Sequence, residues 1–249
     1  MRLFDINCFV GGWTTESYPI ADAGTLADEM ARLGIEGALV RHSWGWLHDP
    51  AEGNAALLGE IAGHHQWRPC LAATPLPEDM GALDHFLASV RRSAAGAVTL
   101  YPASQHFSLT RWGAGELLDA LAAWRLPVLL EYQETTWPSL AEVLAGWPAL
   151  PVVVTRTGYR ILRNLLPMLR TYPNLYVDMA YLGDNLALEH ISQHYGAERV
   201  LFGTGTPRVD GAGSVARLAM STLPDEQKQQ IGAGNAERLL ADAVTQSVA

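Results

Sequence analysis

The sequence predicts one domain, residues 1–249, folded as a single (β/α)8 TIM barrel with an extra C-terminal helix. Eight short apolar runs rich in β-branched residues alternate with segments whose apolar residues recur at helical spacing. The runs begin about 28 residues apart, which is the size of one strand–helix unit. No glycine-rich phosphate loop follows any run, and this weakens the alternative of an open doubly wound sheet.

The expected strands are apolar and end near Gly, Pro or polar residues. They cover residues 2–7, 36–41, 68–74, 97–101, 127–132, 151–156, 174–180 and 199–204. The segments between them have the apolar spacing of amphipathic helices. Helices are expected at 24–33, 51–65, 80–94, 113–124, 139–146, 159–171 and 185–195, and after the last strand at 213–221 and 224–244.

Composition limits the classes of function. The chain has 49% apolar and 17% charged residues, so it can bury one large core. A net charge of -9 argues against a nucleic-acid or anionic-membrane partner, since either requires a basic surface. No apolar run reaches the roughly 20 residues that span a bilayer, and a cytoplasmic location is expected. Cys8 and Cys70 are expected to be buried, reduced thiols.

In such a barrel, reacting groups lie at the C-terminal ends of the strands. Alternation along the first strand is expected to turn Asp5, Asn7 and Phe9 into the barrel and Cys8 away from it. The same rule places further side chains at the mouth. They are Arg41, His42, Trp44, Trp46, His48, Tyr101, His106, Glu131, Tyr132, Arg156, Asp178, Tyr181 and Gly205.

Several stretches resemble the amidohydrolase superfamily, in particular its amidohydrolase-related branch of metal-dependent hydrolases and decarboxylases. The opening Phe4-Asp5-Ile6-Asn7-Cys8-Phe9 is similar to that family's first strand, where an Asp precedes a His-x-His pair. The other similar stretches are 126–131, 151–158, 172–178 and 200–207, and 234–240 resembles the family's closing helix. The resemblance covers the whole chain.

The resemblance implies metal ligands at positions 7, 9, 131, 156 and 205, which here hold Asn7, Phe9, Glu131, Arg156 and Gly205. Thr99 takes the place of the bridging Lys of binuclear members. Divalent metals of the zinc class prefer imidazole, thiolate or carboxylate ligands, and only the glutamate is one of these. The sequence therefore predicts no metal and no cofactor.

The substituted positions have a chemistry of their own. Glu131 and Arg156 end neighbouring strands, so an ion pair between them can replace metal–ligand bonds. Arg41 is expected either to contact an anion or to pair with Asp5. The candidate ligand-binding residues for a small anionic ligand are Asn7, Phe9, Arg41, His42, Tyr101 and Arg156. Glu131 is the candidate catalytic acid or base.

Three interpretations stay open. The protein is a metal-independent hydrolase or lyase acting on a small carboxylated or lactone-like substrate, with Glu131 free of Arg156. In the second interpretation it is a non-catalytic protein that acts as a ligand sensor or as the inactive partner of an active relative, and its protein partner is a second copy of the chain or that relative. In the third interpretation it is a metal-dependent hydrolase or decarboxylase with a non-standard ligand set such as His42, His48 and Glu131.

Overall fold

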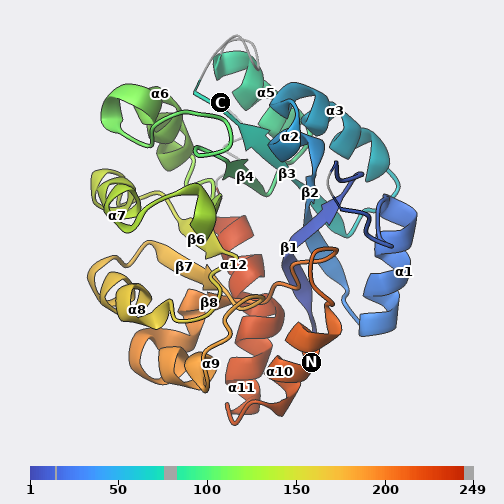
Figure 1. The fold of residues 1–249 in the computed structure, drawn as a ribbon, viewed down its shortest axis with the longest axis vertical. Helices are drawn as coiled ribbons and strands as arrows, with labels where there is room; N and C mark the ends of the chain where they lie inside the picture. Colours follow the sequence, from blue (N-terminus) through green and yellow to red (C-terminus); the bar gives the residue numbers. More distant parts are fainter. Residues whose placement is uncertain (15, 76–82, 244–249) are drawn as a thin grey trace.

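The predicted strands form one parallel sheet that curves into a barrel, with helices around the outside (Figure 1). The computed structural model describes residues 1–14, 16–75 and 83–243. Neighbouring strands pair in chain order from β1 to β8. The strands are β1 (Phe4–Val10), β2 (Gly37–His42), β3 (Trp67–Ala73), β4 (Ala97–Leu100), β5 (Val128–Glu131), β6 (Val152–Thr155), β7 (Leu175–Asp178) and β8 (Val200–Leu201). The (β/α)8 barrel is therefore confirmed.

Backbone hydrogen bonds between β1 and the segment after β8 close the ring. Ile6 N–H donates to Phe202 O at 3.0 Å, and Phe9 N–H donates to Thr206 O at 2.9 Å. Phe202 N–H donates to Ile231 O, in the π turn Gln230–Gly234, at 3.1 Å. β8 is therefore shorter than the predicted 199–204, although residues 202–206 still run beside β1.

Most of the helices begin or end within three residues of the predicted bounds. They are α1 (Ala23–Leu33), α2 (Trp44–Leu47), α3 (Pro50–Glu60), α5 (Leu83–Arg92), α6 (Arg111–Ala123), α7 (Trp137–Gly146), α8 (Leu162–Thr171), α9 (Ala187–Ile191), α10 (Ala212–Met220), α11 (Asp225–Gln229) and α12 (Asn235–Asp242). Side chains of Asp22, Asp49, Thr110 and Thr136 cap the N-termini of α1, α3, α6 and α7. No helix in the described part of the chain is both long and apolar enough to cross a membrane.

Two predicted helices are interrupted, and a third extends beyond the described residues. The helix expected at 185–195 is α-helical only in α9 and continues as a π turn, Ser192–Gly196. The helix expected at 224–244 is divided into α11, the π turn Gln230–Gly234 and α12. A Cβ on Gly232 would lie 2.6 Å from Arg2 O, so this glycine lets the π turn pack against the start of β1. Residues 80–82 of the helix expected at 80–94 lie outside the described residues.

An apolar layer fills the end of the barrel where the strands begin. Its members are Ile6, Leu39, Cys70, Ala97, Leu129, Val153 and Leu201, with Ala236 and Leu239 of α12 packed against them. The C-terminal helix therefore closes this end of the barrel, and Figure 1 shows it crossing the ring of strands. The larger apolar core lies between strands and helices and includes Cys8, which points away from the interior as expected.

One inner-face prediction is wrong. Ile6, rather than Asp5, belongs to the inner layer, because the β1–β2 register shifts between Asp5 and Cys8. The Asp5 carboxylate is buried at the seam between β1 and the segment after β8. It accepts hydrogen bonds from the Thr204 backbone N–H at 3.0 Å and from the Thr204 hydroxyl at 2.5 Å.

Candidate functional site

The inner face of the barrel becomes polar one layer further along the strands. Leu39, Ala97, Leu129 and Val153 belong to the apolar layer, and the residue two positions on faces the same way. The resulting polar layer consists of Asn7, Arg41, Thr99, Glu131, Thr155 and Asp178, each at most 1% exposed. The strands therefore bring ionisable groups together in a water-poor interior.

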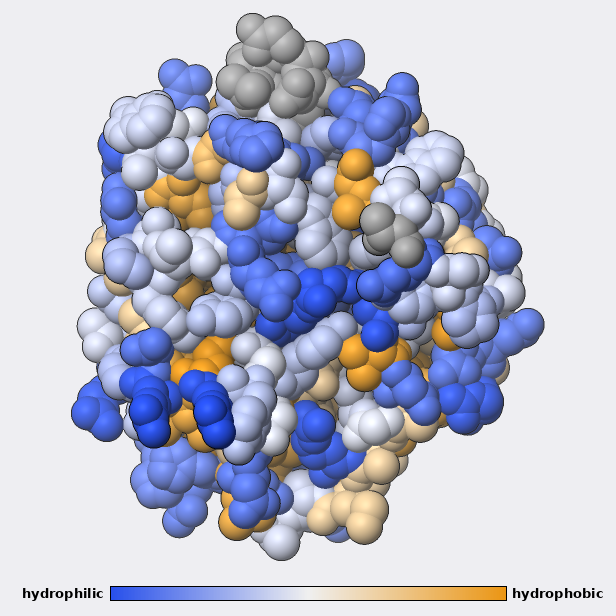
Figure 2. Space-filling view, viewed as in Figure 1, coloured by the Kyte–Doolittle hydropathy of each residue, from blue (hydrophilic) through white to orange (hydrophobic). Residues whose placement is uncertain are grey.

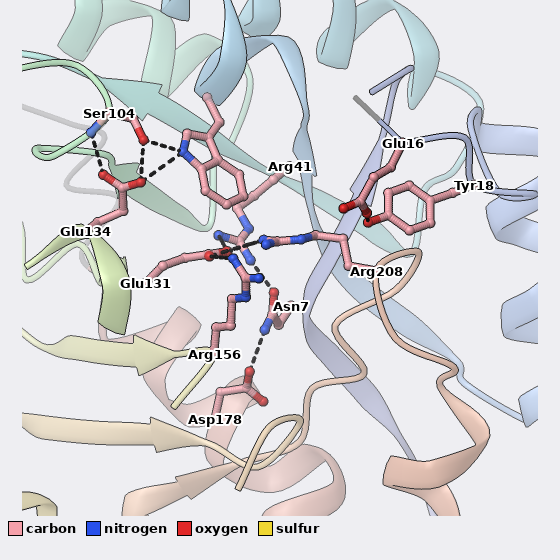
Figure 3. Close-up of polar contacts among 11 residues, drawn as sticks. Asn7, Glu16, Tyr18, Arg41, Ser104, Glu131, Glu134, Arg156, Asp178 and Arg208 are labelled. Atoms are coloured by element: carbon pink, nitrogen blue, oxygen red, sulfur yellow. Dashed lines mark hydrogen bonds and ion pairs between the residues drawn. The ribbon is translucent and has the colours of Figure 1, made fainter. Parts of the chain in front are cut away.

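Three guanidinium groups surround the Glu131 carboxylate (Figure 3). Its Oε1 lies 3.5 Å from Arg41 Nη1, and its Oε2 lies 3.6 Å from Arg156 Nη1 and 3.2 Å from Arg208 Nη1. The predicted ion pair between Glu131 and Arg156 is therefore present. The Arg41 side chain is fully buried, whereas those of Arg156 and Arg208 are 27% and 10% exposed.

A chain of hydrogen bonds continues from Arg41 across the barrel. Its Nη2 donates to Asn7 Oδ1, and Asn7 Nδ2 donates to an Asp178 carboxylate oxygen. Figure 3 shows Asn7 between the two. Arg41 thus contacts Glu131 and Asn7, whereas the hydrogen bonds of Asp5 go to Thr204 and to the Asn7 backbone N–H. Of the two alternatives predicted for Arg41, the pairing with Asp5 is therefore not formed.

Burial governs the ionisation of the carboxyl groups in and beside this layer. It raises the pKa of Asp178 to about 7, against the hydrogen bonds from Ala180 N–H and Asn7. Burial also raises the pKa of Asp5 and that of Glu131, while the Arg41 guanidinium acts in the opposite direction on both. The Asp178 carboxyl therefore titrates close to neutral pH.

Aromatic rings cover the charged groups. The Arg41 guanidinium carbon lies 3.9 Å from the centre of the Phe9 ring. Trp46 stacks on Tyr101 with ring centres 5.0 Å apart, and the Arg208 guanidinium carbon is 4.6 Å from the Trp46 ring centre. Such stacking favours a cation over the ring face. Figure 2, drawn in the orientation of Figure 1, shows hydrophilic surface over the centre of the strand ring.

Sequence reasoning missed two of the charged residues. Arg208 follows directly after Pro207, beyond the last strand. A basic residue so close to a strand end is the feature of the sequence that could have identified it. Glu134 lies in the turn after β5 and is buried. Its carboxylate accepts from the Ser104 hydroxyl at 2.6 Å and from Trp46 Nε1 at 3.0 Å, which fixes the indole in place. No pattern in the sequence links Glu134 to Ser104 and Trp46, which belong to different segments of the chain.

The structure places the histidines apart from the charged cluster. His42 Nε2 lies 3.2 Å from Glu60 Oε1, and burial lowers the pKa of His42. His48 lies 3.0 Å from Glu52, with 64% of its side chain exposed. The set formed by His42, His48 and Glu131 is therefore not assembled. Among residues 1–14, 16–75 and 83–243, no group of three or more His, Cys, Asp or Glu could hold a metal ion.

The positions at which the resemblance implies metal ligands do not fit a divalent cation. Glu131 is the only carboxylate among them, and guanidiniums already surround it. Phe9 and Gly205 provide no donor atom, and Arg156 is a permanent cation. Asn7 uses its side-chain oxygen and nitrogen on Arg41 and Asp178.

The amidohydrolase family model matches residues 21–241, and the chain therefore belongs to this family. None of the curated proteins compared with the chain matches it. Solved structures provide the other comparison, and their low identity to this chain means that they show the fold alone.

Three of these solved structures show which kinds of protein share the fold. An uncharacterized TIM-barrel protein from Bordetella bronchiseptica is 17% identical, with a TM-score of 0.78 over 98% of this chain and 99% of its own. 2,6-Dihydroxybenzoate decarboxylase from Rhizobium is 14% identical, with a TM-score of 0.75 over 97% and 99%. A putative 2-pyrone-4,6-dicarboxylic acid hydrolase from Pseudomonas putida is 16% identical, with a TM-score of 0.72 over 97% and 98%.

Proposed function

We propose that this member of the amidohydrolase family binds a small carboxylate at the barrel mouth, without the metal centre that the family resemblance implies, and that it is a non-catalytic binding protein. The observation that carries the proposal is the surplus of cations. Three guanidiniums converge on one carboxylate, which gives the group of four a formal charge of +2.

Burial divides the three arginines into two kinds. Arg41 and Glu131 are both buried and neutralise one another inside the barrel. Arg156 and Arg208 reach solvent, and among the described residues each has Glu131 as its only acidic partner. A guanidinium presents a fork of N–H donors that matches a carboxylate. The two solvent-facing arginines are therefore the groups that an incoming anion would meet.

The backbone of Arg156 supports a binding role. Its φ of 53° lies in the left-handed region, which costs a residue with a side chain about 1 kcal/mol. Strained conformations of this kind are concentrated at ligand-binding and active sites. Here the conformation accompanies a guanidinium directed at Glu131, as Figure 3 shows.

The state of Glu131 favours binding over catalysis. A general base needs a free oxygen within reach of the substrate's proton. Both oxygens of Glu131 face guanidiniums. A dication placed beside these three cations would also be repelled. The proposal therefore assigns anion binding to the arginines and the role of an internal counter-ion to Glu131.

The test is calorimetric titration with butyrate and with its neutral analogue, butyramide. We expect butyrate alone to bind, and the double variant Arg156→Gln/Arg208→Gln to lose at least about tenfold in affinity, the size of one charge-assisted hydrogen bond. Arg160→Gln is the matched control, because Arg160 is exposed in the same loop. Equal affinity in the double variant and the wild type would contradict the proposal.

Elemental analysis of the purified, tag-free protein, before and after incubation with excess metal, tests the metal-free part. We expect less than about a tenth of an equivalent of zinc, manganese, iron, cobalt or nickel, because a true site fills nearly stoichiometrically. About one equivalent that survives dialysis would restore the metal-dependent hydrolase or decarboxylase. Metal-free turnover of a bound carboxylate would instead support the metal-independent hydrolase or lyase.

A further inference from the structure

Several buried polar atoms of the barrel have no hydrogen-bond partner in the described part of the chain, among them the Thr155 hydroxyl, and three of the others belong to β2 and the end of β4. These three are Nε of Arg41, the hydroxyl oxygen of Thr99 and the hydroxyl oxygen of Tyr101. All three residues are at most 1% exposed. Buried polar groups in native proteins are nearly always paired, so three orphans in one place require an explanation.

These atoms lie in one part of the polar layer. Thr99 and Tyr101 are two residues apart at the end of β4 and face the same way as the inner-layer residue Ala97. Burial raises the pKa of the Tyr101 hydroxyl well above its usual range, and the nearby Arg41 guanidinium acts against that rise. The three groups therefore act on one another at short range.

The strand order explains why Arg41 and Glu131 meet above small side chains. They belong to β2 and β5, and the strands between them contribute Ala72 and Thr99, which pair in register. Both residues are small, and the Arg41 and Glu131 side chains reach one another beside them, with Nη1 and Oε1 3.5 Å apart. A methyl group and a hydroxyl therefore line this side of the ion pair.

A purely structural plug would not have this composition. An unpartnered buried hydroxyl costs free energy, which phenylalanine in place of Tyr101 or valine in place of Thr99 would recover. The shape of the interior would be nearly unchanged by either residue. The Tyr101 oxygen lies close enough to Arg41 and Thr99 to interact with both, but neither hydroxyl makes a hydrogen bond of good geometry with the described part of the chain.

We infer that Arg41, Thr99 and Tyr101 form a second, oxygen-binding subsite beneath the solvent-facing arginines, and that the ligand is a carboxylate with a second acceptor oxygen. This inference rests on the proposed binding of a carboxylate at Arg156 and Arg208. The subsite offers N–H and O–H donors, so its guest is a carboxylate or carbonyl oxygen. For the ligand to enter, the Arg208 guanidinium must release Glu131 and bind the ligand carboxylate in its place.

The experiment compares acids of equal carbon number by calorimetric titration. Malonate, succinate and glutarate carry the second oxygen function, and propionate, butyrate and valerate lack it. We expect wild type to prefer at least one diacid over its monoacid by about tenfold or more, the size of one hydrogen bond to a charged group. Equal affinity across every pair would overturn the subsite.

Tyr101→Phe and Thr99→Val remove the two hydroxyls. We expect each variant to lose the preference for the diacid, to keep the monoacid affinity, and to melt at or above the wild-type temperature. Tyr132→Phe is the matched control, since that ring packs on Trp137 with centres 5.3 Å apart, outside the polar layer. It should keep the wild-type preference.

Two results separate this inference from the function on which it rests. A clear loss of melting temperature in Tyr101→Phe would mean that its hydroxyl has a partner within the folded protein, and the subsite would be rejected. An unchanged diacid preference in Tyr101→Phe and Thr99→Val would reject it as well. Unchanged affinity for every acid in Arg156→Gln/Arg208→Gln would reject the proposed function itself.

Discussion

The two inner layers of the barrel are built from the same strands and have opposite chemistry. At the end closed by α12, Leu39 and Leu129 pack in an apolar layer. Two residues further along the same strands, Arg41 and Glu131 form a buried ion pair. In a barrel of parallel strands the beginnings supply stability and the ends supply chemistry. The polar layer is therefore where this chain departs from a simple core.

The largest expected effect is on the polar layer itself. Arg41→Ala leaves the buried Glu131 carboxylate without its interior partner and removes the donor to Asn7. We expect a loss of about 3–5 kcal/mol in the free energy of unfolding, because removing the fully buried member of an ion pair is costly even when Arg156 and Arg208 still contact Glu131 from the solvent side. Urea denaturation measures it.

A double variant sharpens this prediction. Arg41→Met with Glu131→Leu replaces both charges by apolar groups of similar length, and such replacements are often neutral or stabilising. It should therefore recover most of the stability lost in Arg41→Ala while removing the buried ion pair from the layer. A loss below about 1 kcal/mol in Arg41→Ala would show that Arg156 and Arg208 are sufficient to neutralise Glu131.

The apolar layer should respond to cavity formation alone. Leu129→Ala removes a side chain that is 1% exposed, and we expect it to cost about 3 kcal/mol. Leu186→Ala, at a position that is 59% exposed, should change stability by less than about 0.5 kcal/mol. Carboxylate affinity should stay at the wild-type value in both variants, in contrast to substitution of Arg156. A large loss of affinity in Leu129→Ala would mean that the two layers are not independent.

The fold was predictable from the sequence because its signals are local. Each strand is an apolar run, and the caps at Asp22 and Thr136 mark helix starts by themselves. The errors arise where distant residues decide. Close packing of Gly232 on Arg2 accompanies the break in the last helix, and a register shift against β2 places Asp5 at the seam.

The site was predictable only in part, for the same reason. Strand-end positions located Glu131 and Arg156, and their contact followed from neighbouring strands. Arg208 reaches the same carboxylate from a loop 77 residues away in sequence, and Glu134 contacts Trp46 over a separation of 88. Spacing in one sequence carries no information on such loop conformations. His42 lies apart from the charged cluster because its ring contacts Glu60 on α3.

The smallest expected effect is a dependence of the free energy of unfolding on pH. It arises from Asp178 in the polar layer and has no counterpart in the apolar layer. The pKa of Asp178 is raised to about 7 by burial, against roughly 3.9 in an unfolded chain. Between these values the folded protein holds a proton that the unfolded chain has released, so stability is highest at low pH and falls as pH rises. We expect a decline of about 1 kcal/mol per pH unit from pH 5 to 7 in wild type.

Asp178→Asn removes this titration but keeps an oxygen that can accept from Asn7 or from Ala180 N–H. Urea denaturation at pH 5, 6, 7 and 8 should give a flatter dependence for the variant. Part of the slope should persist, because burial also raises the pKa of Asp5 and that of Glu131. Leu129→Ala should keep the full wild-type slope at lower stability, since the apolar layer has no group that titrates near neutral pH. Identical slopes in wild type and Asp178→Asn would show that Asp178 is already ionised in the folded protein, so that Asn7 and Arg41 stabilise its charge.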